Sequence, residues 1–325
     1  MKRQAFGTLA GVLAAILLLP LPVQAQSDNL SEALGSIGEQ YADNYTQPVT
    51  DALGAGLNSG LFRTAEVGGT GLVPVVDVYV GVSVVGVSTA GSSSSFQPET
   101  EQFTTSNGRT VTVDYGPNRV PTAFGEEQSP GTATISDEQG NSTQVDLPPG
   151  LLNTSIAPLA VPQVGVGTVL GTDAQLRYLP KTSISSYGSV SLFGLSARHS
   201  ISQYIPLFPV DLAVQGTWQS LSVSGNNQDG VVDASGWALN AQVSKSLPLA
   251  PITFYGGLQY EQFGVDVNYS FDSSVGSEEI AFSQDAANSV RALAGVSATL
   301  ALFQVNVDYA LGANNTVSAG VGVTL

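Results

Sequence analysis

Much of the chain after residue 160 alternates between apolar residues and small or polar ones. Near the C-terminus, Val305, Val307 and Tyr309 alternate with Asn306 and Asp308. A period of two predicts β-strands with one apolar face. The clearest alternating segments are 163–180, 210–224, 237–247, 290–300, 303–311 and 316–325.

One long segment, 252–271, changes its apolar face at Glu261. Ile252 and Phe254 lie on one face of the predicted strand, whereas Phe263 and Val265 lie on the other. A β-bulge, or a strand that leaves a membrane, would explain the change. Weaker alternation predicts two further strands, at 72–88 and 189–201.

The connections between these strands are short and long in turn. Those at 247–251 and at Leu302 are tight, whereas 225–234 and 272–288 are long, polar and acidic. This pattern is typical of outer-membrane β-barrels, whose short turns are periplasmic. Counting back from a periplasmic C-terminus gives eight strands, the eighth being 163–180. The strand at 72–88 and one further strand between residues 89 and 162 bring the barrel to about ten, within a range of about 8 to 14.

A different spacing precedes the strands, with apolar residues three or four positions apart. It predicts two short amphipathic helices over 30–57, with Pro48 in the first turn of the second. We expect this segment, 26–62, to plug or gate the periplasmic mouth of a barrel formed by 63–325. The plug face carries Leu34, Ile37, Tyr41 and Tyr45.

Residues 1–25 have the pattern of a secretory signal peptide. Lys2 and Arg3 precede an apolar run that is broken by Pro20 and is too short for a membrane-spanning helix. We expect cleavage after Ala25, export, and residence in the bacterial outer membrane.

The segment 89–160 is rich in Ser, Thr, Pro and Gly and interrupts the alternation. It is predicted to be a long polar surface excursion with hairpins near 109–115 and 132–145.

Composition indicates which face of the strands is inside. Only 11% of the residues are charged, and the face opposite the valines carries Gly, Ser, Thr, Gln and Asn rather than Lys and Glu. Such a face suits a confined lumen, so the valines are predicted to face lipid. The fold is therefore predicted to be all-β, an antiparallel transmembrane β-barrel with a short N-terminal helical segment; a secreted or cell-surface β-sandwich is the alternative.

Charge and rare residues exclude several functions. Loss of Lys2 and Arg3 with the signal changes the net charge from −16 to −18, which disfavours nucleic acid as a partner. The absence of Cys and the presence of a single His argue against a thiolate or multi-histidine metal site. We expect no metal and no cofactor.

Polar residues on the inward face are the candidates for lumen chemistry. They could form a selectivity constriction, bind a solute, or simply pair with one another to hold the barrel in shape. The lumen-facing candidates are Asp173, Arg177, Asp211, Gln215, Asn240, Gln242, Arg291, Asn306 and Asp308.

Ser196, His199 and Ser200 invite comparison with outer-membrane lipid hydrolases. However, alternation on one strand points Ser196 and His199 to opposite faces, whereas a nucleophile needs its base within hydrogen-bond reach. We therefore expect no catalytic residue and no enzyme activity.

Several motifs in order resemble one family. The motifs are YADNYTQPVTDALGAGLNSGLF, RYLPKTSISSYGSVSLFGLSARHSISQYIP, PVDLAVQGTWQ and GWALNAQVSKSL. They resemble an uncharacterised family of exported proteins of Bacteroidota-type Gram-negative bacteria, catalogued as a domain of unknown function. The resemblance implies an outer-membrane barrel and no particular ligand. The element order is also similar to that of fatty-acid-transporter-type barrels, in which an N-terminal helical segment plugs the lumen.

The expected function is that of a passive channel or transporter for small or hydrophobic solutes, gated by the N-terminal segment. The alternative is a closed structural or surface-interaction barrel whose excursion binds a partner, and a lipid hydrolase is a distant third. The expected partners are outer-membrane lipid and, if the barrel conducts, a small or hydrophobic solute.

Overall fold

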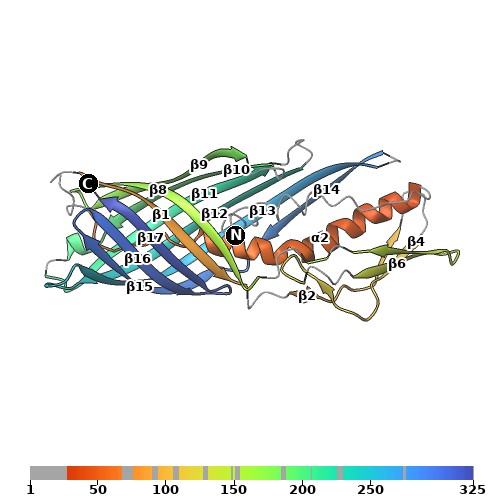
Figure 1. Ribbon diagram of the computed structural model, residues 1–325, viewed down its shortest axis with the longest axis horizontal. Helices are drawn as coiled ribbons and strands as arrows, with labels where there is room; N and C mark the ends of the chain where they lie inside the picture. Colours follow the sequence, from red (N-terminus) through yellow and green to blue (C-terminus); the bar gives the residue numbers. More distant parts are fainter. Residues whose placement is uncertain are drawn as a thin grey trace, which may run out of the picture.

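The computed structural model is a closed antiparallel barrel of ten strands, which confirms the predicted fold class (Figure 1). The structure describes residues 28–67, 76–89, 94–104, 110–126, 131–147, 149–150, 154–183, 188–205, 207–224, 230–273 and 276–324. The predicted signal peptide and the loop 225–229 lie outside these ranges.

The barrel strands are β1 (Val76–Ser88), β8 (Ile156–Thr168), β9 (Thr172–Ser183), β10 (Ser189–Ser200) and β11 (Asp211–Ser224). The others are β12 (Gly230–Ser246), β13 (Ile252–Ser273), β15 (Val290–Leu300), β16 (Phe303–Leu311) and β17 (Thr316–Thr324). Pairing of β1 with both β8 and β17, and of β12 with β13, closes the ring.

The two ends of the barrel differ. We call the end that carries the connections 169–171, 247–251 and 301–302 the short-turn end; β1 begins and β17 ends there. The opposite end, the loop end, carries the long excursions. A short 3₁₀ helix, η2 (Ser202–Tyr204), lies in the connection between β10 and β11.

The outer surface of the barrel is apolar, as the alternation predicted. Val305, Val307 and Val321 are 44 to 55% exposed, whereas Asn306 and Asp308 are buried inside. Exposed valine, leucine and aromatic side chains that face away from a polar interior are characteristic of a wall in contact with lipid.

One predicted strand is in fact a hairpin. Residues 163–180 contribute to β8 and β9, which are joined by a turn at Val169, Leu170 and Gly171. Gly171 has a φ of +69°, which a tight turn requires and which glycine adopts readily. Two of the three turn residues are apolar, so the turn was hidden within the alternation. The count of ten was correct, but β8, which begins at Ile156, is the strand expected within the excursion.

The change of face at Glu261 is not a bulge. β13 pairs with β12 without a register shift from Thr253 to Tyr269, and Phe263, Val265 and Val267 stay on the inside. The outside becomes polar there, so the strand has left the apolar band. Beyond this point β13 exchanges its partner β15 for β14 (Gly276–Asp285), which forms much of the expected 272–288 loop.

A single helix, α2 (Asp28–Leu57), replaces the two short helices expected, and Pro48 lies inside it. An internal proline costs a helix ~3 kcal/mol or more. The surroundings of α2 offset this cost, because the helix is enclosed on several sides from Tyr41 onward. No helix in the described part of the chain is long and apolar enough to cross a membrane.

The excursion forms two small sheets that pack against α2. One pairs β2 (Ser95–Phe96) with β5 (Val120–Pro121). The other joins β3 (Glu101–Thr104), β4 (Thr110–Asp114), β6 (Thr132–Asp137) and β7 (Ser142–Asp146) in that order. The β6–β7 hairpin agrees with the one predicted near 132–145. We call the described part of residues 94–150 the cap.

Candidate functional site

α2 occupies the loop end of the lumen. Figure 1 shows it running from inside the barrel outward, beside the β13–β14 extension and the small sheets of the cap. Residues 58–67, which we call the linker, continue inside the barrel toward the short-turn end, where β1 begins. The sequence predicted this segment at the mouth with the short turns, whereas the structure places the helix at the opposite end.

The loop end of the lumen is an apolar core. Ala52, Leu53 and Leu57 of α2 are at most 3% exposed, so the helix is sealed against the strands around it. The prediction of a polar inward face fails here, because the inward residues that surround the helix are apolar. They are Val85, Val87, Ala157, Val161, Leu192, Leu221, Val223, Val232, Ala234, Phe263, Val265 and Val267.

The same core continues into the cap. Tyr41 and Tyr45 of α2 belong to it together with Val113 and Ile135 of the cap sheet. Burial raises the pKa of both tyrosines above the ordinary phenol value. The Tyr45 hydroxyl donates to the Pro149 carbonyl at 2.7 Å. Of the four predicted plug residues, Tyr41 and Tyr45 are thus buried, whereas the side chains of Leu34 and Ile37 lie outside what the structure describes.

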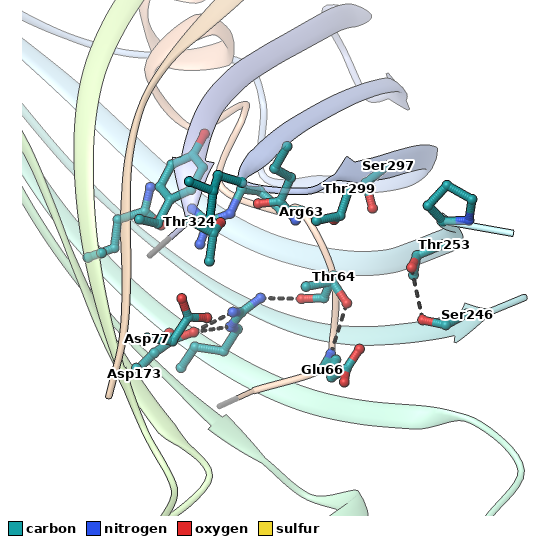
Figure 2. Close-up of a pocket in the computed structure, with 18 of the residues that line it drawn as sticks. Arg63, Thr64, Glu66, Asp77, Asp173, Ser246, Thr253, Ser297, Thr299 and Thr324 are labelled. Atoms are coloured by element: carbon teal, nitrogen blue, oxygen red, sulfur yellow. Dashed lines mark hydrogen bonds and ion pairs between the residues drawn. The ribbon is translucent and has the colours of Figure 1, made fainter. Parts of the chain in front are cut away.

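The short-turn end holds a polar cavity of about 310 Å³, which we call the vestibule (Figure 2). Arg63, Thr64 and Glu66 of the linker form one side, and Asp77 and Asp173 of the wall lie opposite. Hydroxyl groups complete the lining, from Ser246, Thr253, Ser297, Thr299 and Thr324.

Ionic contacts fix part of the vestibule. Arg198 pairs with Asp173 and also donates to the carbonyl of Thr64, which ties the linker to the wall. The guanidinium of Arg63 lies 3.7 Å from the ring centroid of Tyr79. Partial burial, with the carboxylates of Asp211 and Asp77 nearby, raises the pKa of Glu66.

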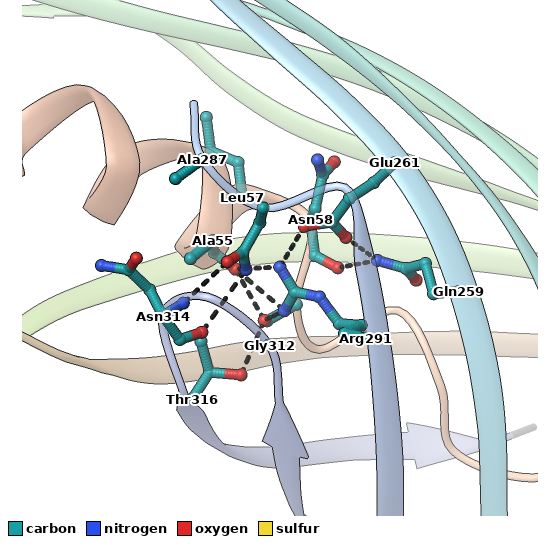
Figure 3. A network of polar contacts seen from close by, with 12 residues as sticks. Ala55, Leu57, Asn58, Gln259, Glu261, Ala287, Arg291, Gly312, Asn314 and Thr316 are labelled. Atoms are coloured by element: carbon teal, nitrogen blue, oxygen red, sulfur yellow. Dashed lines mark hydrogen bonds and ion pairs between the residues drawn. The ribbon is translucent and has the colours of Figure 1, made fainter. Parts of the chain in front are cut away.

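Between the vestibule and the apolar core, two arginines, Arg177 and Arg291, hold the end of α2; Figure 3 shows Arg291. Arg177 of β9 donates to the carbonyls of Leu57 and Ser59 at 2.7 and 2.8 Å. Arg291 of β15 donates to the carbonyl of Ala55 at 3.2 Å and to the Ser59 hydroxyl. The last carbonyls of a helix have no partner within the helix and carry its negative dipole end, so cations stabilise them.

A carboxylate and a row of amides complete this contact, which we call the plug anchor. Glu261 pairs with Arg291 at 2.5 Å, and both side chains are 1% exposed. Gln259 donates to the Asn58 carbonyl at 2.9 Å, and Gln219 donates to the Asn58 side chain at 2.7 Å. The plug anchor thus consists of Arg177, Gln219, Gln259, Glu261 and Arg291, acting on residues 55–59.

Seven of the nine predicted lumen residues are at most 5% exposed inside the barrel: Arg177, Gln215, Asn240, Gln242, Arg291, Asn306 and Asp308. The structure separates them into three groups, of which one, Asn306 and Asp308, contacts the Tyr255 hydroxyl. Arg177 and Arg291 meet at the helix end, whereas Gln215, Gln242 and Asn240 form a chain of amide hydrogen bonds along the wall. Asp173 lines the vestibule, and Asp211 is half-buried at the start of β11.

Sequence reasoning missed Glu261, Arg198 and the linker pair Arg63 and Glu66. Alternation could have found Arg198, which lies two residues after the inward Ser196. Glu261 was recognised only as the place where the apolar pattern changes. The linker has no apolar periodicity, so its sequence did not indicate that Arg63 and Glu66 line the lumen.

The Ser–His pattern does not assemble. Ser196 is 3% exposed inside the barrel and bonds Thr217, with the two hydroxyl oxygens 2.8 Å apart. His199 lies on the other face of β10, with Nδ1 2.7 Å from the Thr172 hydroxyl and Nε2 2.9 Å from the Tyr204 hydroxyl. Within the described ranges, no group of three His, Cys, Asp or Glu residues could hold a metal ion.

The chain belongs to DUF6588, a family of unknown function whose model matches residues 1–325. The curated proteins contain no match to this chain. Among solved structures, it is similar to Ail, the attachment invasion locus protein of Yersinia pestis, which was crystallised with the heparin analogue sucrose octasulfate. The identity is 9% and the TM-score 0.29, with 77% of this chain and 97% of that one covered.

Two further barrels show the same degree of similarity. A loop-deletion mutant of OmpT, an outer-membrane protein of Vibrio cholerae, is 10% identical with a TM-score of 0.26, covering 77% of this chain and 99% of that one. The translocator domain of the autotransporter NalP from Neisseria meningitidis is 13% identical with a TM-score of 0.24, covering 77% and 88%.

Proposed function

We propose that this protein is an outer-membrane barrel that its own N-terminal segment keeps closed, and that it holds the cap at the cell surface for interaction with a partner. The observation that carries the proposal is the single apolar core shared by the barrel wall, α2 and the cap. A barrel built only to conduct solutes has no need to pack a helix and a separate domain into one core.

The asymmetry of the barrel supports the orientation. Short turns are periplasmic in outer-membrane barrels, so the loop end and the cap face outward. Export with cleavage after Ala25, and outer-membrane lipid as the partner of the apolar wall, are parts of the same proposal. It assigns no catalytic role.

A gated channel for small or hydrophobic solutes is the second candidate. The observation that favours it is the plug anchor, in which polar contacts hold the last carbonyls of the helix. Polar contacts can be exchanged for water when a segment moves, so a helix held in this way could be released.

Single cysteines test the orientation, because the chain contains none of its own. Glu138 lies in the exposed β6–β7 turn, and Leu249 is fully exposed in the β12–β13 turn. A membrane-impermeant maleimide should label Glu138→Cys in intact cells and Leu249→Cys only after the outer membrane is permeabilised. The reverse pattern would place the cap in the periplasm and overturn the proposal.

A further inference from the structure

The vestibule contains a cation, Arg63, part of whose hydrogen-bonding capacity is unused among the described residues. Nε and Nη1 of Arg63 are buried, and neither has a hydrogen-bond partner in the part of the chain that the structure describes. A buried polar group without a partner costs free energy, and the cost is greater when the group is charged. The Tyr79 ring, 3.7 Å away, stabilises the cation from one side but provides no acceptor in the guanidinium plane.

The linker holds this arginine in place. The Thr64 carbonyl accepts a hydrogen bond from Arg198, and the Ala65 amide donates to the Ser244 hydroxyl at 3.0 Å. Two consecutive residues are thus fixed to the wall. Their neighbours Arg63 and Glu66 both line the vestibule, so the linker presents one positive and one negative group to the same cavity (Figure 2).

The other ionic groups of the vestibule are less available. Arg198 and Asp173 are paired with each other. Asp77, like Glu66, carries a carboxylate, so the lining holds a second acidic group besides the paired Asp173. A ligand therefore meets a guanidinium with two unpartnered nitrogens, and carboxylates that favour a cationic group.

We propose that the vestibule binds a small zwitterion, of the size of an amino acid or dipeptide, with its carboxylate at Arg63 and its ammonium group at Glu66. The cavity of about 310 Å³ lies at the small end of the ~300–1,000 Å³ typical of ligand pockets. Guanidinium N–H groups form strong, charge-assisted hydrogen bonds with carboxylates. Hydroxyls such as those of Thr299 and Thr324 supply neutral hydrogen bonds around the backbone of the ligand.

This inference does not rest on the surface role proposed above, because the vestibule lies at the opposite end of the barrel from the cap. Orientation of the barrel and binding in the vestibule can each fail without the other.

Titration calorimetry on the full chain in detergent tests the inference with three probes: alanyl-alanine, its N-acetyl form and its C-terminal amide. Alanyl-alanine should bind, and each blocked form should bind about tenfold more weakly or not at all. If alanyl-alanine does not bind, or if both blocked forms bind equally well, the inference is wrong.

Variants locate the site. Arg63→Gln should abolish binding of alanyl-alanine, Arg63→Lys should retain part of it, and Glu66→Gln should remove the preference over the N-acetyl form. Lys181→Gln is the matched control, because it removes one positive charge from an exposed position on β9 outside the vestibule. Glu66 is only partly buried and keeps contact with solvent, so its variant should fold even if Arg63→Gln does not. Unchanged selectivity in Glu66→Gln would contradict the inference.

Discussion

Arg177 and Arg291 stand on strands five places apart around the ring of ten, and both donate hydrogen bonds to Ser59. Arg177 donates to the carbonyl of Ser59, and Arg291 donates to its hydroxyl. Two diametrically opposed strands therefore hold the same point, just beyond the end of α2. This contact fixes the depth of the plug in the lumen, because the helix cannot slide without breaking bonds on both sides.

Arg291→Met should be strongly destabilising. It leaves Glu261 as an unpaired carboxylate in a site where both partners are 1% exposed. Breaking a buried pair from one side costs about 3–5 kcal/mol. Equilibrium urea unfolding in lipid vesicles, followed by gel mobility, measures the loss in the free energy of unfolding.

Two further variants separate the pair from the general effect of removing a charge. Arg291→Met combined with Glu261→Gln should recover part of the loss, because no charge is then left unpaired. Lys181→Met, at an exposed position, should change the free energy of unfolding by about 0.5 kcal/mol or less. If Arg291→Met were as stable as the parent, the plug anchor would not stabilise the barrel.

Gly60→Ala should destabilise the barrel more than Gly116→Ala. Both glycines have positive φ values, of +64° and +69°. A Cβ at Gly116 meets nothing within 4 Å, whereas at Gly60 it lies 2.0 Å from the Ser83 hydroxyl and 3.1 Å from the Ser83 Cβ. Gly116→Ala therefore measures the backbone cost alone, about 1 kcal/mol. Equal losses in the two variants would show that the linker does not approach β1 at Ser83.

Much of the barrel wall could be predicted from the sequence, because alternation reports directly on which face meets lipid. The hairpin at 169–171 could not, because Val169 and Leu170 are apolar in a turn and continue the pattern of the strands. The continuity of α2 through Pro48 could not be predicted from the sequence either. Local preference favours a break at Pro48, and only the enclosure of the helix by the barrel and cap outweighs it.

Gly56→Cys with Leu159→Cys should form a disulfide that locks α2 to β8. A Cβ at Gly56 lies 3.8 Å from the Cβ of Leu159, which is the usual separation in a disulfide. Gel mobility with and without reductant, on protein isolated from cells, reports the bond. The pair Gly56→Cys and Leu249→Cys is the control and should not cross-link, because Leu249 lies at the short-turn end. Cross-linking of the control alone would contradict the position of the plug.

Trp218 and Trp237 should lie at the outer boundary of the lipid. They are directly opposed on β11 and β12, and Trp237 contacts Tyr260 edge-on with the ring centroids 5.4 Å apart. The next outward-facing residues toward the loop end, Ser235 and Gln262, are polar and exposed. Amphipathic aromatic rings prefer this boundary.

Single-tryptophan variants, Trp218→Phe and Trp237→Phe, allow each indole to be measured in vesicles. Lipids brominated near the head group should quench both tryptophans more than lipids brominated near the end of the acyl chain. Stronger quenching by the deep bromines would contradict this position. It would show that the lipid boundary lies nearer the loop end and that less of β12 and β13 extends beyond the membrane.

The candidate sites were only partly visible in the sequence. Arg177 and Arg291 could be predicted as inward because they alternate with apolar neighbours. Their role could not, because it depends on contact with residues 55–59, more than a hundred positions away in the chain. Arg63 and Glu66 lie in a segment without a period, and only the folded linker brings them to one cavity.

Planar-bilayer recording on the full chain tests the closed barrel most directly. We expect no steady conductance above that of the bare membrane, because α2 and the linker fill the lumen. The variant with Gly56→Cys and Leu159→Cys, with its disulfide oxidised, should show the same absence of conductance. A stable conductance in the parent that disappears on oxidation of this disulfide would contradict a closed barrel and show a channel that opens by moving its plug.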